Sequence, residues 1–198
     1  MPVPDAINSF YAKDTKSWRS WLQKNGEKEN FIWLILHKKE SGKKTVSYEE
    51  AVEEALCFGW IDSKANKRDD ESFYLSFARR NPKSSWSKLN KERVAKLVAQ
   101  GKMTDAGLSV IESAKANGAW EALTAVDALL LPDALQKAFA NNKKAKDYFD
   151  AFPPSTRRGI LEWINNAKRA ETNAKRIDET VRLAERNERA AQYTPKNV

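Results

Sequence analysis

The residues best suited to chemistry are gathered in one stretch of the chain, between Cys57 and Trp86. In this stretch aromatic rings alternate with cationic side chains, and Asp62 is the one carboxylate outside the charged turn 68–71. The candidate ligand-binding residues are Trp60, Asp62, Lys64, Arg79, Arg80, Lys83 and Trp86. Guanidinium and ammonium groups donate hydrogen bonds to phosphate or carboxylate, and aromatic rings can cover the flat part of a ligand. The stretch therefore predicts a face that binds something anionic, polar or planar, and it assigns no catalytic residue.

These residues also have a structural interpretation. Asp62 is expected near the start of a strand, where a salt bridge to a cation across a hairpin could fix the fold. In the functional interpretation, Asp62 accepts hydrogen bonds inside a cleft that is walled by Trp60 and Trp86. Tryptophans are core residues by default, and a partly exposed ring could stack on a base or a sugar. The sequence leaves both interpretations open.

Nucleophilic and metal-centred chemistry have little support in the sequence. His37 is the only histidine and Cys57 the only cysteine, so a zinc site would lack convergent ligands. A catalytic triad would have to use a histidine that lies on an apolar strand. Cys57 is expected at a helix C-terminus, which is the wrong end to lower the pKa of a thiol, so it is expected to be buried and inert. We therefore expect no metal site and no cofactor.

The net charge of +8 is concentrated in one segment. Residues 64–102 contain eleven Lys or Arg and four Asp or Glu, a local balance of +7. A basic surface of this kind attracts an anionic ligand, an acidic partner or nucleic acid. The alternative is a solvated face that keeps the protein in solution. The sequence contains no indication of the oligomeric state.

The sequence predicts no transmembrane segment and a cytoplasmic location. The longest apolar run, Phe31 to Leu36, is far shorter than the ~20 residues that a bilayer requires. The first residues, Met-Pro-Val-Pro-Asp, do not form a cationic segment followed by an apolar one, so they do not read as a secretory signal.

The pattern of elements predicts an α+β fold: a small three-stranded, mainly antiparallel sheet with N-terminal helices, followed by an all-helical C-terminal half. The expected strands are 31–37, 60–67 and 72–79, the last two forming a hairpin. A helix over about 8–25 precedes the first strand, and Ser47 with Glu50 forms a capping box that begins another. Residues 31–37 are apolar on both alternating faces, which is typical of a central strand covered on both sides.

The C-terminal half contains one clear interruption, Phe152-Pro-Pro-Ser155. The two prolines end one helix, and Ser155 could cap the next. We therefore expect an α+β domain over 1–152 and a C-terminal two-helix subdomain over 153–198.

Three segments carry a family resemblance: Glu53 to Ser63, Phe77 to Asn90, and Tyr148 to Ile164 with the following Ala167 to Ile177. They resemble the bacterial YdeI/OmpD-associated family, also called bacteriocin-protection proteins. The resemblance implies a role in protection from cationic antimicrobial peptides and an association with an outer-membrane porin. It supplies no catalytic residue that could be assigned to this chain. A surface with a charge of +8 would also repel cationic peptides.

The leading hypothesis is a non-enzymatic binding protein for bacteriocin protection or a stress response, which binds through residues 60–86. One alternative is a nucleic-acid-binding module that uses the basic 64–102 segment, with binding that weakens steeply with salt. A second alternative is an enzyme acting on a small anionic substrate, with Asp62 and the Arg79–Arg80 pair lining its pocket.

Overall fold

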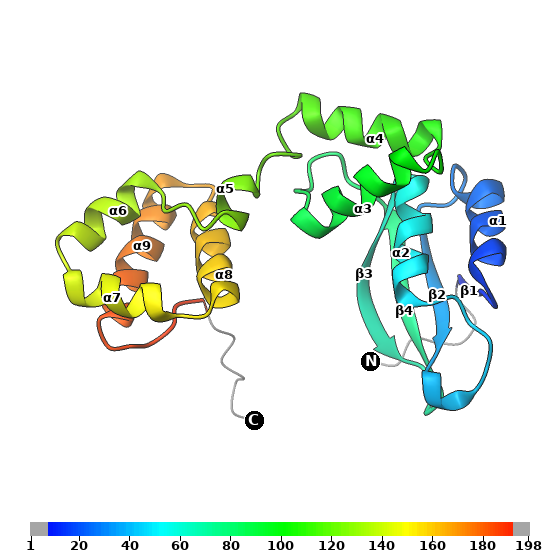
Figure 1. The fold of residues 1–198 in the computed structure, drawn as a ribbon, viewed down its shortest axis with the longest axis horizontal. Helices are drawn as coiled ribbons and strands as arrows, with labels where there is room; N and C mark the ends of the chain where they lie inside the picture. The colour runs from blue at the N-terminus through cyan, green and yellow to red at the C-terminus, as the bar shows by residue number, and fades with distance from the viewer. Residues whose placement is uncertain (1–7, 192–198) are drawn as a thin grey trace. The chain divides into compact units, whose positions relative to one another are not determined.

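The computed structural model describes residues 8–191 of the 198-residue chain. The chain divides into two units, 1–120 and 121–198. In the described residues the first unit combines a sheet with helices, and the second contains helices (Figure 1). The predicted α+β class is therefore confirmed.

The sheet of the first unit has the strand order β1-β2-β4-β3. Strand β2 (Phe31–His37) pairs antiparallel with β4 (Ser72–Arg79), and β4 pairs antiparallel with β3 (Trp60–Lys67). These three strands and the hairpin have the bounds that the alternating apolar pattern predicts. The hairpin is confirmed.

The first strand of the sheet corrects the predicted fold. Strand β1 (Ser9–Tyr11) pairs parallel with β2, so the described sheet is four-stranded and mixed instead of three-stranded and mainly antiparallel. The helix expected over 8–25 begins only at α1 (Thr15–Asn25), because Asp14 caps it by accepting from Ser17 N at 2.7 Å. The three residues of β1 lie at the sheet edge, and so short a strand carries too few alternations to be recognised.

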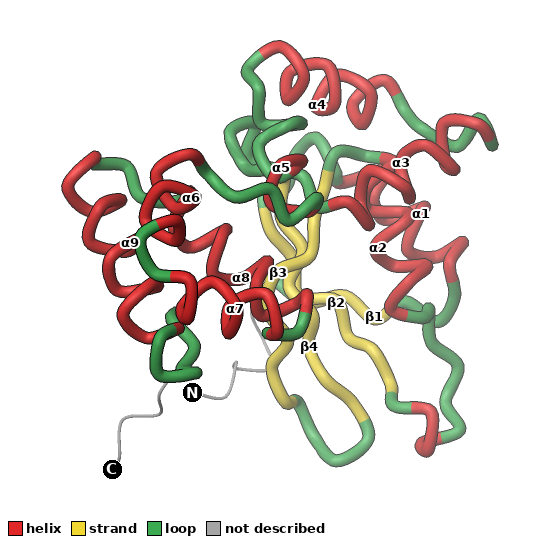
Figure 2. Tube along the Cα trace, turned by 60° about the vertical axis from the view of Figure 1, so that its left-hand side comes forward, coloured by secondary structure: helices red, strands yellow, loops and turns green. Residues whose placement is uncertain are grey.

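Two helices cover one face of the sheet (Figures 1 and 2). They are α1 and α2 (Tyr48–Cys57), and the 3₁₀ turn η1 (Lys39–Ser41) lies between β2 and α2. The predicted capping box of α2 is confirmed, since Glu50 N donates to Ser47 Oγ at 3.2 Å and Ser47 N donates to Glu50 Oε2 at 3.0 Å. The buried β2 side chains on this face are Ile32, Leu34 and Leu36.

The opposite face of the sheet is less buried. Its β2 side chains are Phe31, Trp33, Ile35 and His37, which are half-buried or exposed. Among residues 8–120, no helix packs on this face (Figures 1 and 2). The expectation that helices cover β2 on both sides therefore holds for one face of the sheet only.

Helices α3 (Lys88–Ala99) and α4 (Asp105–Ala116) complete the first unit. Thr104 caps α4, and its Oγ1 also donates to the carbonyl of Cys57 at 2.6 Å. A Cβ on Gly107 would lie 2.2 Å from the same carbonyl oxygen, so glycine is required for α4 to approach the end of α2 this closely.

The second unit contains α5 (Thr124–Asp127), α6 (Asp133–Ala140), α7 (Lys143–Ala151), α8 (Pro154–Asn165) and α9 (Ala170–Ala184). Its core is a separate cluster that includes Phe139, Phe149, Phe152, Ile160 and Ile164. None of the helices between residues 8 and 191 combines the length and the apolar character needed to cross a bilayer.

Pro153 and Pro154 join α7 to α8 inside this second unit. Pro153 is the N-cap of α8 and no side chain caps that helix, so the capping role predicted for Ser155 was wrong. The units divide after Trp120, whereas the sequence places a domain boundary after residue 152. The reason is that Phe152 packs on Phe149, with ring centroids 6.1 Å apart, in the same core as α8. A separate subdomain over 153–198 stays a prediction.

Candidate functional site

The seven predicted ligand-binding residues are distributed over distinct places in the first unit. Trp60 and Arg79 meet at the turn after α1, Arg80 and Trp86 stack on each other, and Asp62 contacts α2. Lys64 and Lys83 are exposed. The structure thus brings four of the seven residues together in two pairs, Trp60 with Arg79 and Arg80 with Trp86, and does not gather all of them at one cleft.

Trp60 and Arg79 hold the turn that precedes β2. Trp60 is fully buried, and its Nε1 donates to the carbonyl of Gly26 at 3.1 Å. Arg79 Nε donates to the same carbonyl at 3.1 Å and to that of Glu29 at 3.1 Å. Both side chains therefore satisfy backbone acceptors, and Trp60 is not available as the wall of a cleft.

Arg80 and Trp86 form a stacked pair in a buried position. The Arg80 guanidinium lies 3.8 Å from the centre of the Trp86 ring, and the two residues are 7% and 2% exposed. One terminal nitrogen of Arg80 donates to the carbonyl of Ser85 at 2.6 Å. This contact closes the loop between β4 and α3 around the guanidinium.

The loop that contains these residues is fixed by its own hydrogen bonds. Lys83 N donates to Asn81 Oδ1 at 2.9 Å, which forms a local turn. Asn117 Nδ2, at the end of α4, donates to the carbonyl of Pro82 at 2.9 Å. The exposed side chain of Lys83 therefore projects from a loop that is anchored at both ends.

Arg80 is a buried cation without an ion-pair partner among the described residues. Burial lowers its pKa to about 10, and the negative charge of Asp62 opposes this shift. The side chain is therefore protonated at neutral pH. Arg80 Nε and Trp86 Nε1 are both buried, and neither has a hydrogen-bond partner in residues 8–191. Buried donors of this kind are costly unless an acceptor satisfies them.

Asp62 accepts a hydrogen bond that the sequence did not predict. Tyr48 Oη, from the first turn of α2, donates to Asp62 Oδ2 at 2.9 Å. Burial raises the pKa of Tyr48, and the bond to Asp62 raises it further, while the charge of Arg93 acts in the opposite direction. The salt bridge considered for Asp62 is not formed with any described residue.

Lys64 lies where the pairing of β3 with β4 is irregular. The register shifts between Asp62 and Ala65, and Lys64 N donates to Ser76 Oγ at 2.7 Å. A bulge of this kind turns the strand and exposes the side chain of Lys64.

Two residues at the end of α4 extend the stacked pair, and the sequence analysis missed both. The Trp120 ring lies 4.9 Å from the Trp86 ring, and Lys115 Nζ lies 5.4 Å from the centre of the Trp120 ring. We call Arg80, Trp86, Lys115 and Trp120 the arginine–tryptophan cluster. No local motif marks Lys115 and Trp120, because the contact joins segments more than 30 residues apart in sequence.

The other chemically capable residues lie elsewhere. The His37 ring packs edge-on against Tyr11, with centroids 5.2 Å apart. Cys57 is buried, and burial raises the pKa of its thiol. Between residues 8 and 191 there is no group of three or more His, Cys, Asp or Glu that could hold a metal ion.

Family models match both units of the chain. Residues 10–110, just over half of the chain, match a model described as a domain of unknown function, DUF8412. Residues 128–187 match a model described as Bacteriocin-protection, YdeI or OmpD-Associated. No match to a curated protein or to a solved structure was found. The resemblance to the YdeI/OmpD-associated family is thus supported by a match in the second unit.

Proposed function

Since the chain belongs to the DUF8412 family through residues 10–110 and matches the YdeI/OmpD-associated family through residues 128–187, we propose that it is a non-enzymatic binding protein that protects against bacteriocins or other antimicrobial peptides. Its ligand is anionic and binds at the arginine–tryptophan cluster. The proposed location is the cytoplasm. The family description supports the protective role, and the cluster supports the chemistry of the ligand.

The observation that carries the proposal is the environment of Arg80. Arg80 is 7% exposed and forms no ion pair with a described residue, and the Trp86 ring and one hydrogen bond to Ser85 leave its Nε without an acceptor, so its lost hydration is only partly compensated. An anion supplied by a ligand would provide that compensation. Lys115 adds a second cation to the cluster, and Lys83 projects from the same loop as Arg80; neither lysine forms an ion pair with a described residue.

The charge of the chain favours an anionic partner over direct capture of the peptides. Bacteriocin-type peptides are commonly cationic, and a chain with a net charge of +8 repels them. Protection would then come from binding an anionic component of the cell.

The enzyme alternative is weakened by the geometry of Arg79. It requires Asp62, Arg79 and Arg80 to line one pocket, but Arg79 donates to backbone carbonyls at the turn after α1. The nucleic-acid alternative uses the basic 64–102 segment, and ion pairs reduce the free positive charge of that segment. Several cations in that segment are neutralised by ion pairs: Lys67–Asp70, Arg68–Asp69, Lys88–Glu92 and Lys96–Glu53.

A binding experiment tests the site. The protein would be titrated with inorganic phosphate and with citrate, and the N–H resonances of arginine and tryptophan side chains followed by NMR. We expect saturable shifts of Arg80 Nε–H and Trp86 Nε1–H. Arg80→Met should abolish the shift of Trp86 Nε1–H, while Arg182→Met, at an exposed arginine of α9, should leave both shifts unchanged. Equal binding by both variants would rule out the cluster as the site.

A survival experiment tests the role. Bacteria producing the wild-type chain, the Arg80→Met variant or neither would be exposed to a cationic antimicrobial peptide. We expect higher survival with the wild type only. If the wild type gives no protection the role is wrong, and if Arg80→Met protects equally the role does not depend on this anion site.

A further inference from the structure

One face of the sheet is not covered by α1 and α2, and we call it the open sheet face. Register pairing places Phe31, Trp33, Ile35 and His37 of β2 opposite Ala78, Ser76, Tyr74 and Ser72 of β4 on this face. Tyr11 of β1 lies beside Ile35. The apolar pattern that predicted cover on both sides of β2 is therefore present, but no helix of residues 8–120 provides the second cover.

The aromatic side chains on the open sheet face form a continuous group. The Phe31 and Trp33 rings are perpendicular, with centroids 5.3 Å apart, and the Trp33 and Tyr74 centroids are 6.0 Å apart. Phe31 is 37% exposed and Tyr11 is 42% exposed. Exposed rings held by neighbouring rings on a rigid sheet provide flat surfaces of fixed orientation.

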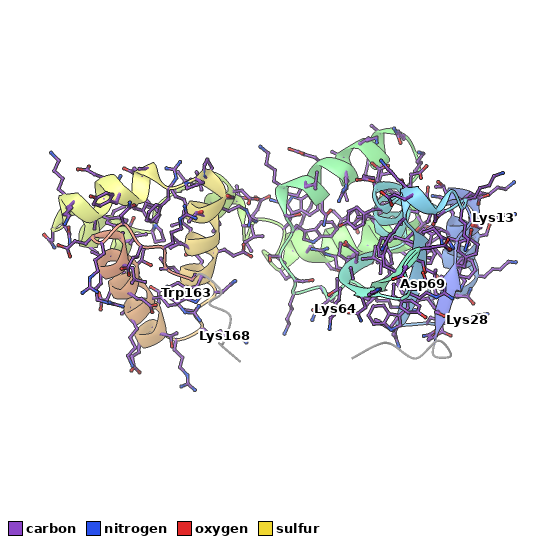
Figure 3. All side chains as sticks on the ribbon, turned by 90° about the horizontal axis from the view of Figure 1, so that it is seen from below. Lys13, Lys28, Lys64, Asp69, Trp163 and Lys168 are labelled. Atoms are coloured by element: carbon purple, nitrogen blue, oxygen red, sulfur yellow. The ribbon has the colours of Figure 1, made fainter. Side chains whose placement is uncertain are left out.

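The charge beside this face that no ion pair neutralises is positive. Lys64 is exposed next to Ser76 and forms no ion pair with a described residue. The Arg68 guanidinium lies 5.9 Å from the centre of the Tyr74 ring and pairs with Asp69 at 3.2 Å, while Lys67 and Lys43 pair with the other two acidic residues of the turn, Asp70 and Glu71. Asp62 is the one carboxylate on the described strands, and it pairs with Phe77 on the face that the helices cover. Figure 3 shows Lys28 and Lys64 on the side of the sheet that faces away from α4.

We propose that the open sheet face binds single-stranded nucleic acid. The bases stack on Phe31, Trp33 and Tyr11, and the phosphates lie against Lys64. Aromatic rings on a sheet recognise unpaired bases by stacking, and cations at the border neutralise the backbone. A duplex hides the faces of its bases, so it would lack the stacking contribution.

Charge complementarity favours this occupant over a second copy of the chain. Two copies packed face to face would bring the Lys64 side chains of both open sheet faces to one interface, and the carboxylates of the nearby turn, Asp69, Asp70 and Glu71, are already paired with Arg68, Lys67 and Lys43. A nucleic-acid strand supplies the negative charge that the face lacks. The proposal is independent of the anion site at Arg80, which lies in the loop between β4 and α3.

The test is fluorescence anisotropy with labelled oligo(dT), oligo(U) and a DNA duplex of equal length, at low and at raised salt. We expect the single strands to bind more tightly than the duplex and their affinity to fall steeply with salt. Phe31→Ser should weaken binding by about fivefold or more, because one stacking surface is lost. Lys64→Glu should weaken binding and reduce its dependence on salt.

Tyr148→Ser in α7 is the matched control, since Tyr148 and Phe31 are both 37% exposed. It should bind like the wild type. Circular dichroism of each variant would establish that it is folded. The proposal is overturned if single strands do not bind at low salt, or if folded Phe31→Ser binds them as the wild type does. It is also overturned if light scattering detects a dimer that Phe31→Ser abolishes, because that result assigns the face to a second copy.

Discussion

Arg79 and Trp60 donate hydrogen bonds to one and the same acceptor, the carbonyl of Gly26. They are register partners on β4 and β3, so the hairpin delivers both donors to the turn that follows α1. A charged donor shared between carbonyls stabilises the fold by about 1–3 kcal/mol. We therefore expect Arg79→Met to lower the free energy of unfolding by about that amount in denaturant titrations.

Lys83→Met is the control for this variant, since Lys83 is exposed and its side chain lies on the loop between β4 and α3. Its stability should stay within about 0.5 kcal/mol of the wild type. If Arg79→Met were as stable as Lys83→Met, the hydrogen bonds to the turn would not contribute to stability.

Gly59 and Gly42 form a matched pair of glycines with positive φ, +74° and +66°. Alanine at Gly42 meets no atom within 4 Å, so Gly42→Ala should cost only the strain of the left-handed conformation, about 1–2 kcal/mol. Alanine at Gly59 would place its Cβ 2.9 Å from Val110 Cγ2 and 3.3 Å from the carbonyl of Ala106. Gly59→Ala should therefore cost about 1–3 kcal/mol more. Equal midpoints in urea would contradict this difference.

The capping box of α2 predicts a dependence of stability on pH. Hydrogen bonds from Ser47 lower the pKa of Glu50 from its usual 4.5. The Glu50 carboxylate of the folded chain therefore takes up a proton less readily than that of the unfolded chain. The stabilisation that the ionised Glu50 gives to the fold is complete above the pKa of Glu50 in the unfolded chain. It is lost as the pH falls through the lower pKa of Glu50 in the folded chain. Ser47→Ala should lower the free energy of unfolding at pH 7 by about 0.5–2 kcal/mol, with a smaller effect in acid.

Much of the first unit could be predicted because several of its elements are determined by residues close together in sequence. The capping pairs Ser47–Glu50 and the hairpin of β3 and β4 depend on residues close together in sequence, and both are confirmed. Strand β1 was missed because three residues cannot establish a period of two. Its strand conformation depends on pairing with β2, more than 20 residues away.

The candidate site was predicted less completely, for a similar reason. Residue types identified Arg80 and Trp86, but the sequence could not distinguish donors that satisfy backbone carbonyls, such as Arg79, from donors left without an acceptor. Trp120 joins the cluster only through the packing of α4 against the loop. The hydrogen bond from Tyr48 to Asp62 likewise depends on the position of α2 over the sheet.

Cys57 should be unreactive in the folded protein. The residue is fully buried, and the pKa of its thiol is raised by burial and by the charge of Glu54, against the opposing effect of Arg19. Since the thiolate is the reactive species, DTNB at pH 8 should label the chain only after unfolding in guanidinium. Rapid labelling of the native protein would show that the end of α2 opens frequently.

The division between the units predicts which fragments fold. The core of the second unit combines Leu135 and Phe139 of α6, Phe149 of α7 and Ile160 of α8. A fragment of residues 121–198 retains this whole cluster and should show cooperative thermal unfolding by circular dichroism. A fragment of residues 153–198 loses the side chains that α6 and α7 contribute, and about 45 residues rarely form a stable core without them. We expect it to show no cooperative transition. Cooperative unfolding of 153–198 would instead establish the two-helix subdomain that the Phe152-Pro-Pro-Ser155 interruption predicts.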